Sequence, residues 1–169
     1  MASEDDVGLT EGVEVRETDA GRFQVTARTA GGTFLVDEPV AAGGLGSGPT
    51  PYDLLSAALG ACTLMTIKLY AERKAWPLRS ARVRVLHRRD ALEAQDRFAR
   101  EIVLEGELNP EQRRRLLEIA ERCPVHQTLA RGSKIGTVLS ELPLEGHLDP
   151  EPIDHASHMV EACEQQDAA

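Results

Sequence analysis

The sequence predicts an α+β fold in a single domain of ordinary size. Three observations predict it: short segments in which apolar and polar residues alternate, a long helix with no charge in its middle, and a second helix with one apolar face. The chain has 169 residues, of which 41% are hydrophobic, and a chain of this length buries a substantial core. We therefore expect antiparallel strands packed with helices.

The strands are indicated by a period of two. Such a period is typical of a strand with one face in solvent, and turns that contain glycine separate the first three segments. The simplest arrangement of those three is an antiparallel meander. In the fifth segment Phe98, Ile102 and Leu104 share one face. The predicted strands cover residues 13–16, 23–28, 33–37, 81–88, 98–106 and, for a last short one, 134–139.

The long helix has a clear beginning. Thr50 is a suitable N-cap, Pro51 fits the first helical position, and Asp53 stands where a capping box places its acid. The helix runs to about Lys74, a length of roughly 36 Å. Because it is apolar or small on every face, it must be surrounded by other elements.

A second helix opens at Asn109 by the same capping logic. Helical spacing turns Cys123 at its end toward the core. Because a proline disfavours helix at the residue before it, the helix should break before Pro124.

The ends of the chain and one loop differ in composition from the predicted core. Residues 39–48 contain four glycines and no Gly-Lys-Ser/Thr, so they favour a flexible hinge or lid over a phosphate loop. We place the domain at residues 11–142, after a loose arm at 1–10. Residues 143–169 are acidic and predict a mobile tail, with a short helix near 154–164 as one option.

Charge and composition exclude several classes of function. The net charge of -9 argues against nucleic-acid binding. The N-terminus has no apolar core of a signal peptide, and the uncharged stretch at 54–67 is too short to cross a bilayer. We expect no membrane association and a cytoplasmic location. No cysteine pair has metal-ligand spacing, so we expect no bound metal or cofactor.

The two thiols allow two interpretations. Cys62 lies within the uncharged helix and Cys123 precedes a proline. They are either inert core residues or a redox couple, which requires that their Cα atoms lie about 4.4 to 6.8 Å apart and that one thiol ionise. His126 is either a general base for Cys123 or a polar side chain bonded to backbone.

Ionisation of Cys62 requires a cation from elsewhere in the fold, because the residue lies about three turns from the start of its helix. Arg16, Arg22 and Arg28 on the N-terminal strands are the candidates. Asp53 is the nearest carboxylate in sequence that would orient such an arginine. On an ideal helix, however, it lies on the face opposite Cys62.

Three segments resemble the OsmC/Ohr family: GPTPYDLL at 48–55, LGACT at 59–63 and CPVHQTL at 123–129. The resemblance extends from about Val13 to Leu139. It is nearest to the OsmC-like branch that also occurs fused to α/β-hydrolase domains. It implies a swapped homodimer in which antiparallel sheets wrap two long central helices, with sites at the subunit interface.

The resemblance also implies a thiol-dependent peroxidase. Cys62 would attack an organic hydroperoxide, expected to be small and apolar, and become a sulfenic acid. Cys123 would resolve it as a disulfide, with Arg16 and Asp53 as the activating pair. An external dithiol of the dihydrolipoamide type, or a lipoylated protein, would reduce the disulfide. Tyr52 stands where these peroxidases carry glutamate, which favours the alternative of a non-catalytic small-molecule-binding or accessory module.

Overall fold

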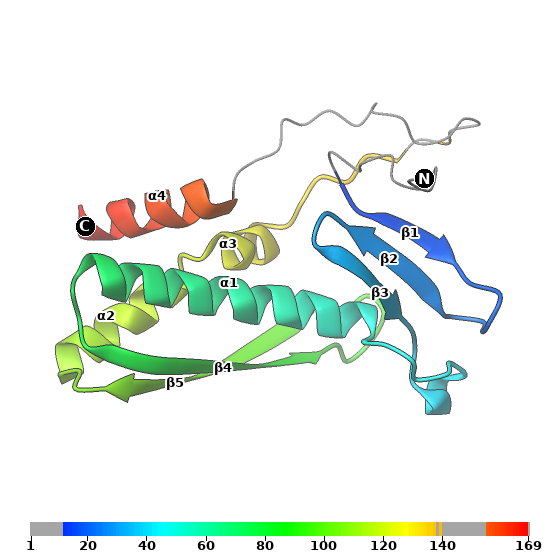
Figure 1. The fold of residues 1–169 in the computed structure, drawn as a ribbon, viewed down its shortest axis with the longest axis horizontal. Helices are drawn as coiled ribbons and strands as arrows, with labels where there is room; N and C mark the ends of the chain where they lie inside the picture. The colour runs from blue at the N-terminus through cyan, green and yellow to red at the C-terminus, as the bar shows by residue number, and fades with distance from the viewer. Residues whose placement is uncertain (1–11, 138, 140–154, 169) are drawn as a thin grey trace, which may run out of the picture. The chain divides into compact units, whose positions relative to one another are not determined.

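The computed structural model describes residues 12–137, 139 and 155–168 (Figure 1). The chain divides into two compact units, and the division falls between Leu54 and Leu55, close to the start of the long helix. The predicted α+β class is confirmed, because antiparallel strands and helices make up the described chain. The predicted arm at 1–10 lies outside the described residues.

The first unit contains the predicted meander. Strands β1 (Glu14–Glu17), β2 (Val25–Thr29) and β3 (Gly32–Val36) form an antiparallel sheet in that order. In the register, Val25 lies opposite Glu17 on one side and Val36 on the other. Alternation in the sequence therefore located all three strands.

A buried carboxylate holds the glycine-rich loop after β3, which includes a short 3-10 turn, η1 (Val40–Ala42). Asp37 is 1% exposed and accepts hydrogen bonds from the backbone N–H groups of Glu38, Leu45 and Ser47, and from the Ser47 hydroxyl at 2.8 Å. Burial opposes ionisation, but these bonds hold the pKa of Asp37 below its ordinary value. The loop predicted as a flexible hinge or lid is therefore fastened from within.

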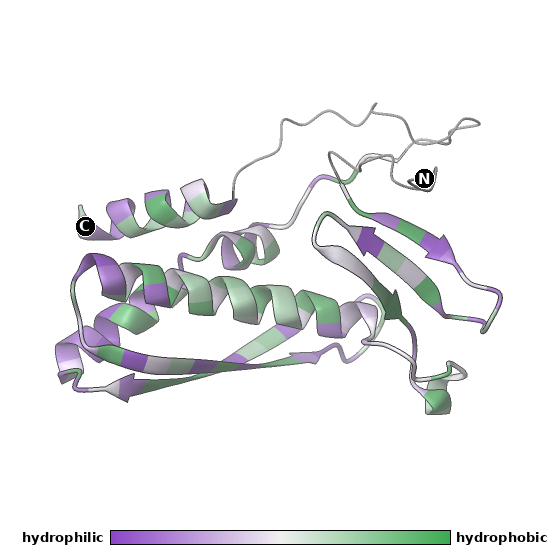
Figure 2. Ribbon diagram, in the orientation of Figure 1, coloured by the Kyte–Doolittle hydropathy of each residue, from purple (hydrophilic) through white to green (hydrophobic). Residues whose placement is uncertain are grey.

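Helix α1 (Pro51–Arg73) begins as predicted. The Thr50 N–H donates to Asp53 Oδ2 at 2.9 Å, and the Asp53 N–H donates to Thr50 Oγ1 at 3.1 Å, which is a reciprocal cap. Figure 2 shows the uncharged middle of α1 as pale and green turns. By length and composition α1 is apolar enough to cross a membrane, yet Ile67 and Tyr70 are at most 1% exposed within the protein core.

The second unit builds a strand ribbon and three further helices around α1. Strands β4 (Leu78–Arg88) and β5 (Arg97–Gly106) pair antiparallel, and Figure 1 shows α1 lying along them. Helix α2 (Pro110–Ala120) starts with the predicted cap at Asn109 and ends before Pro124, as expected. The sequence did not predict α3 (Pro124–Arg131).

One predicted strand is wrong. Residues 134–137 and 139 have no regular structure, and residue 138 lies outside the described part of the chain. This segment follows Gly132, whose φ of 75° ends α3. Ile135 and Leu139 are 88% and 97% exposed, so the apolar residues that suggested a strand have no buried face to fill within the described structure.

The C-terminal helix is packed against the core. Helix α4 (His155–Asp167) buries Cys163 completely, in a cluster with residues of α1 and α2. The Tyr70 hydroxyl donates to Asp167 Oδ1 at 2.9 Å, and the Arg115 guanidinium donates to the Gln166 carbonyl oxygen. The short helix predicted near 154–164 is confirmed and contributes to the core of the second unit. The rest of the predicted tail before it, residues 143–154, lies outside the described residues.

Candidate functional site at the start of helix α3

Both predicted thiols lie at the first turn of α3. Cys123 is the N-cap of this helix, and its extended backbone is what a following proline favours. Pro124 has no N–H, so the next two amides are the first free donors of the turn. The Val125 N–H donates to Cys62 Sγ at 3.3 Å, and the His126 N–H donates to Cys123 Sγ at 3.4 Å. The first turn of α3 therefore donates one backbone hydrogen bond to each sulfur atom.

The two thiols are buried and contact each other. Cys62 is 2% exposed and Cys123 is fully buried, and they share a small apolar cluster with Leu59. The hydrogen bond between the two thiols lowers the pKa of Cys123 despite burial, which opposes it. The same bond and burial raise the pKa of Cys62. The first negative charge of the pair is therefore stabilised on Cys123.

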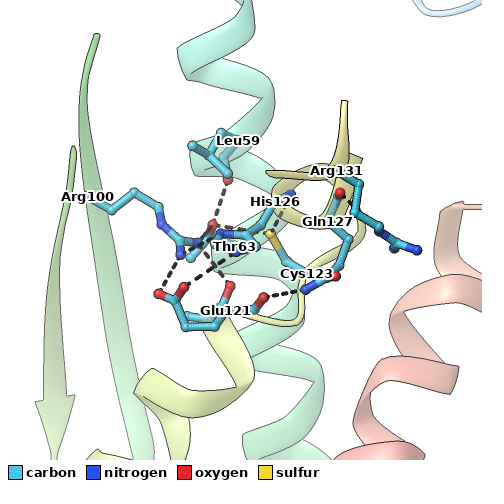
Figure 3. A network of polar contacts seen from close by, with 9 residues as sticks. Leu59, Thr63, Arg100, Glu121, Cys123, His126, Gln127 and Arg131 are labelled. Carbon is cyan, nitrogen blue, oxygen red and sulfur yellow. Dashed lines mark hydrogen bonds and ion pairs between the residues drawn. The ribbon is translucent and has the colours of Figure 1, made fainter. Parts of the chain in front are cut away.

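Arg100 on β5 connects the polar groups around Cys123 (Figure 3). Its side chain is 8% exposed. One terminal nitrogen donates to Thr63 Oγ1 at 2.8 Å and to the Ala120 carbonyl oxygen at 2.9 Å. Thr63 Oγ1 lies 3.5 Å from Cys123 Sγ. Arg100 thus caps the C-terminal end of α2 and favours a thiolate at Cys123 through its charge and through Thr63.

The second terminal nitrogen of Arg100 fixes the state of His126. It donates to Glu121 Oε1 at 2.7 Å and lies 3.0 Å from His126 Nδ1. Because arginine only donates, Nδ1 accepts and the ring proton belongs on Nε2, which lies 3.5 Å from Glu121 Oε2. The ring of His126 is therefore engaged with Arg100 and Glu121, and its backbone N–H is the group that contacts Cys123.

A second histidine contacts the other thiol. Nε2 of His155, the first residue of α4, lies 3.2 Å from Cys62 Sγ. Cys62 therefore lies between the α3 amide, the Cys123 sulfur and an imidazole. The third cysteine, Cys163, has its pKa raised chiefly by burial, as expected of an inert core thiol.

The structure gives the other predicted site residues local roles. Asp53 caps α1 through Thr50, and these bonds lower its pKa. Arg16 lies on β1, is 74% exposed and pairs with Glu14 at 2.6 Å. Both belong to the first unit, and their action on Cys62 stays a prediction.

Sequence reasoning missed three residues that contact or support the thiols: Thr63, Arg100 and His155. Arg100 carried a signal, because it falls in the same alternation as Phe98 and Ile102, on the buried face of β5. An arginine at such a position requires buried partners. His155 carried no comparable signal, since its distance in sequence from Cys62 hides the contact.

Two hollows adjoin these elements. A cleft of about 1070 Å³ lies among α2, α3 and α4, with charged and polar residues that include Arg122, His126, Arg131 and His158. A smaller one of about 310 Å³ lies between α1 and β4 and is lined by small and apolar side chains. Within residues 12–137, 139 and 155–168, no three His, Cys, Asp or Glu side chains gather as metal ligands do.

Comparison with known proteins agrees with the fold. The family model described as OsmC-like protein matches residues 44–138. Solved structures with the same fold include a putative osmotic stress induced and detoxification response protein from Psychrobacter arcticus (23% identity over 69% of this chain and 85% of that chain, TM-score 0.60). No curated protein matches this sequence.

Two further structures carry names that refer to hydroperoxide resistance. The organic hydroperoxide resistance protein OsmC from Legionella pneumophila is 20% identical over 69% of this chain and 86% of that chain, with a TM-score of 0.55. The organic hydroperoxide resistance protein OhrB of Bacillus subtilis is 22% identical over 69% of this chain and 87% of that chain, with a TM-score of 0.50. The family model spans more than half of the chain and includes Cys62, Arg100 and Cys123. The chain therefore belongs to the OsmC-like family.

Proposed function

We propose that this protein reduces organic hydroperoxides with the Cys62–Cys123 dithiol. The observation that carries the proposal is the placement of both sulfur atoms at one helix start, in contact with each other and within reach of a buried arginine. Two inert core cysteines do not require a cation, two amide donors and a threonine hydroxyl around them. A dithiol that cycles through an anion does.

The proposed reaction has three steps. The Cys62 sulfur attacks the terminal peroxide oxygen, the O–O bond breaks, and the alcohol leaves with one proton, so that Cys62 becomes a sulfenic acid. The Cys123 sulfur then bonds to the Cys62 sulfur and water leaves. An external dithiol, of the dihydrolipoamide type or carried on a lipoylated protein, exchanges with the disulfide and restores both thiols. The organic peroxide is reduced by two electrons and the external dithiol is oxidised.

The electrostatics divide the work between the two cysteines. Cys123 is the more acidic thiol, since its hydrogen bond with Cys62, Thr63, the His126 amide and Arg100 lower its pKa. This makes it a ready partner for a sulfenic acid at Cys62. Cys62 needs another group to take its proton, because its own pKa is raised.

We also propose that the protein works as a homodimer. The middle of α1 leaves Ala57, Ala61 and Met65 exposed although this stretch of the helix has no charge. Gly60 lies on the adjoining hollow against β4. Small residues allow another helix backbone to approach closely, and an uncharged exposed face favours association. Sedimentation should give a dimer at micromolar concentration, and a monomer would contradict this part of the proposal.

Peroxide treatment of the reduced protein tests the reaction. With tert-butyl hydroperoxide and dihydrolipoamide we expect turnover in the native protein and none in Cys62→Ser. Mass spectrometry should find a Cys62–Cys123 disulfide, and Cys123→Ser should instead accumulate Cys62 sulfenic acid. Cys163→Ser is the matched control and should retain activity. Consumption of peroxide no faster than in Cys62→Ser, without the disulfide, would leave the binding or accessory module as the function.

A further inference from the structure

The contact between His155 and Cys62 is supplied by a part of the chain outside the family match. The family model ends at residue 138, and α4 begins at His155. This helix is fixed to the second unit by the buried Cys163, by the Lys74–Asp167 ion pair at 2.7 Å and by Gln166. His155 itself is exposed at the start of this anchored helix, and its Nε2 lies 3.2 Å from Cys62 Sγ.

The hydrogen bonds around Cys62 leave one proton with two possible acceptors. The Val125 N–H already donates to the sulfur, so the thiol proton points either to Cys123 or to His155 Nε2. Among the described residues, the polar groups nearest Cys62 are Thr66 on α1, the Val125 amide and Cys123 at the start of α3, and His155 on α4. Arg100 on β5 acts through Thr63 and also contacts Glu121 and His126, whereas β4 packs against the pair only with the apolar Val85. An imidazole is the strongest neutral base in this set.

We propose that His155 is the base that takes the thiol proton of Cys62 and returns it to the alcohol product. This role rests on the hydroperoxide reduction proposed above. The neutral ring accepts the proton at Nε2 while the sulfur electron pair bonds to the terminal peroxide oxygen. As the O–O bond breaks, the leaving alkoxide takes that proton, so the ring is neutral again after each turnover. No other oxidant or reductant is needed for this step.

The ionisation of Cys123 explains why Cys62 needs a base of its own. Arg100 and Thr63 stabilise negative charge on Cys123, whereas His155 contacts Cys62. If Cys123 is already ionised, removal of a second proton from Cys62 produces adjacent anions. A protonated His155 beside Cys62 compensates that charge. A positioned general base of this kind contributes about 10²- to 10⁴-fold to a rate.

The test compares His155→Gln with His158→Gln. The second variant makes the same change one turn further along α4, at a residue that lines the polar cleft among α2, α3 and α4, and serves as the matched control. Alkylation of Cys62 by iodoacetamide is followed by peptide mass spectrometry across pH, so that the other cysteines do not interfere. Turnover of tert-butyl hydroperoxide is measured on the same proteins, and thermal melts check folding.

We expect His155→Gln to lower kcat/KM for the peroxide by about 10²-fold and to move the Cys62 alkylation profile to higher pH, while His158→Gln leaves both unchanged. Excess peroxide should still drive the variant to the Cys62–Cys123 disulfide. An alkylation profile identical in His155→Gln and the native protein would overturn the role of His155 even if the native protein reduces peroxides. A shifted profile in a protein without peroxide turnover would instead overturn the proposed function and leave the His155–Cys62 pair intact.

Discussion

Each unit of this protein buries an ionisable group, and the two groups are satisfied in different ways. Asp37 in the first unit receives three backbone N–H groups and one hydroxyl, all from its own loop. Cys62 and Cys123 in the second unit lie beside each other and have donors from several elements around them. A carboxylate surrounded by fixed donors keeps its loop in one conformation. Two sulfur atoms with more than one proton acceptor nearby can change their protonation state, which a catalytic cycle requires.

The largest expected effect is in the loop around Asp37. A Cβ built on Gly44 lies 2.0 Å from the Glu38 carbonyl oxygen, whereas one on Gly31 meets only the Thr29 side chain at 3.7 Å. Because the obstacle at Gly44 is backbone, Gly44→Ala should lower the free energy of unfolding by about 3 kcal/mol or more. Gly31→Ala should change it by less than about 1 kcal/mol. Denaturation in urea measures both, and equal stabilities would contradict the view of a fastened loop.

The next effect separates the two cysteines. Arg100→Met removes the charge that favours the Cys123 thiolate, so the pKa of Cys123 should rise by about one unit, or about 1.4 kcal/mol. Arg100→Lys keeps the charge but loses the forked donors, so the pKa of Cys123 in this variant should lie between those in the native protein and in Arg100→Met. The ultraviolet absorbance of the thiolate, followed against pH in a Cys62→Ser background, measures the change. An unchanged Cys123 titration in Arg100→Met would show that the charge of Arg100 does not stabilise the anion.

The smallest effect is the acid dependence of the first unit. Since the folded-state pKa of Asp37 is lowered, its carboxylate contributes stability that is fully present above its unfolded pKa, near 3.8. That stability is lost as the pH falls through the lower folded value. The gap in unfolding free energy between the native protein and Asp37→Asn should therefore narrow below about pH 4. A gap that widens with acid would mean that the carboxyl is protonated in the fold.

The two units also differ in how far the sequence predicts them. Local signals were sufficient for the meander, for the Thr50–Asp53 cap and for the break before Pro124, because each depends on residues a few positions apart. The inward position of Cys123 followed from helical spacing, and the burial of Cys62 followed from the uncharged helix that contains it. A run of apolar residues also led to the incorrect strand at 134–139, since periodicity does not reveal whether a partner strand exists.

The surroundings of the thiols could not be predicted in the same way. Arg100, Thr63 and His155 reach the pair from a strand and two helices that meet only in the folded protein. The sequence analysis places the candidate cations on the N-terminal strands, with Arg16, whereas the cation that acts on Cys123 is Arg100 on β5. The arginine at a buried-face position of β5 indicates such a cation, because a guanidinium is buried only where it has hydrogen-bond or ion-pair partners.

The missing amide hydrogen of Pro124 has one more consequence. It leaves the Val125 and His126 amides to donate to sulfur, and a disulfide sulfur accepts such bonds more weakly than a thiolate. Oxidation would therefore loosen the opening turn of α3, and reduction would tighten it. A reductant that exchanges with the disulfide would then meet a first turn of α3 that is looser in the oxidised protein than in the reduced one.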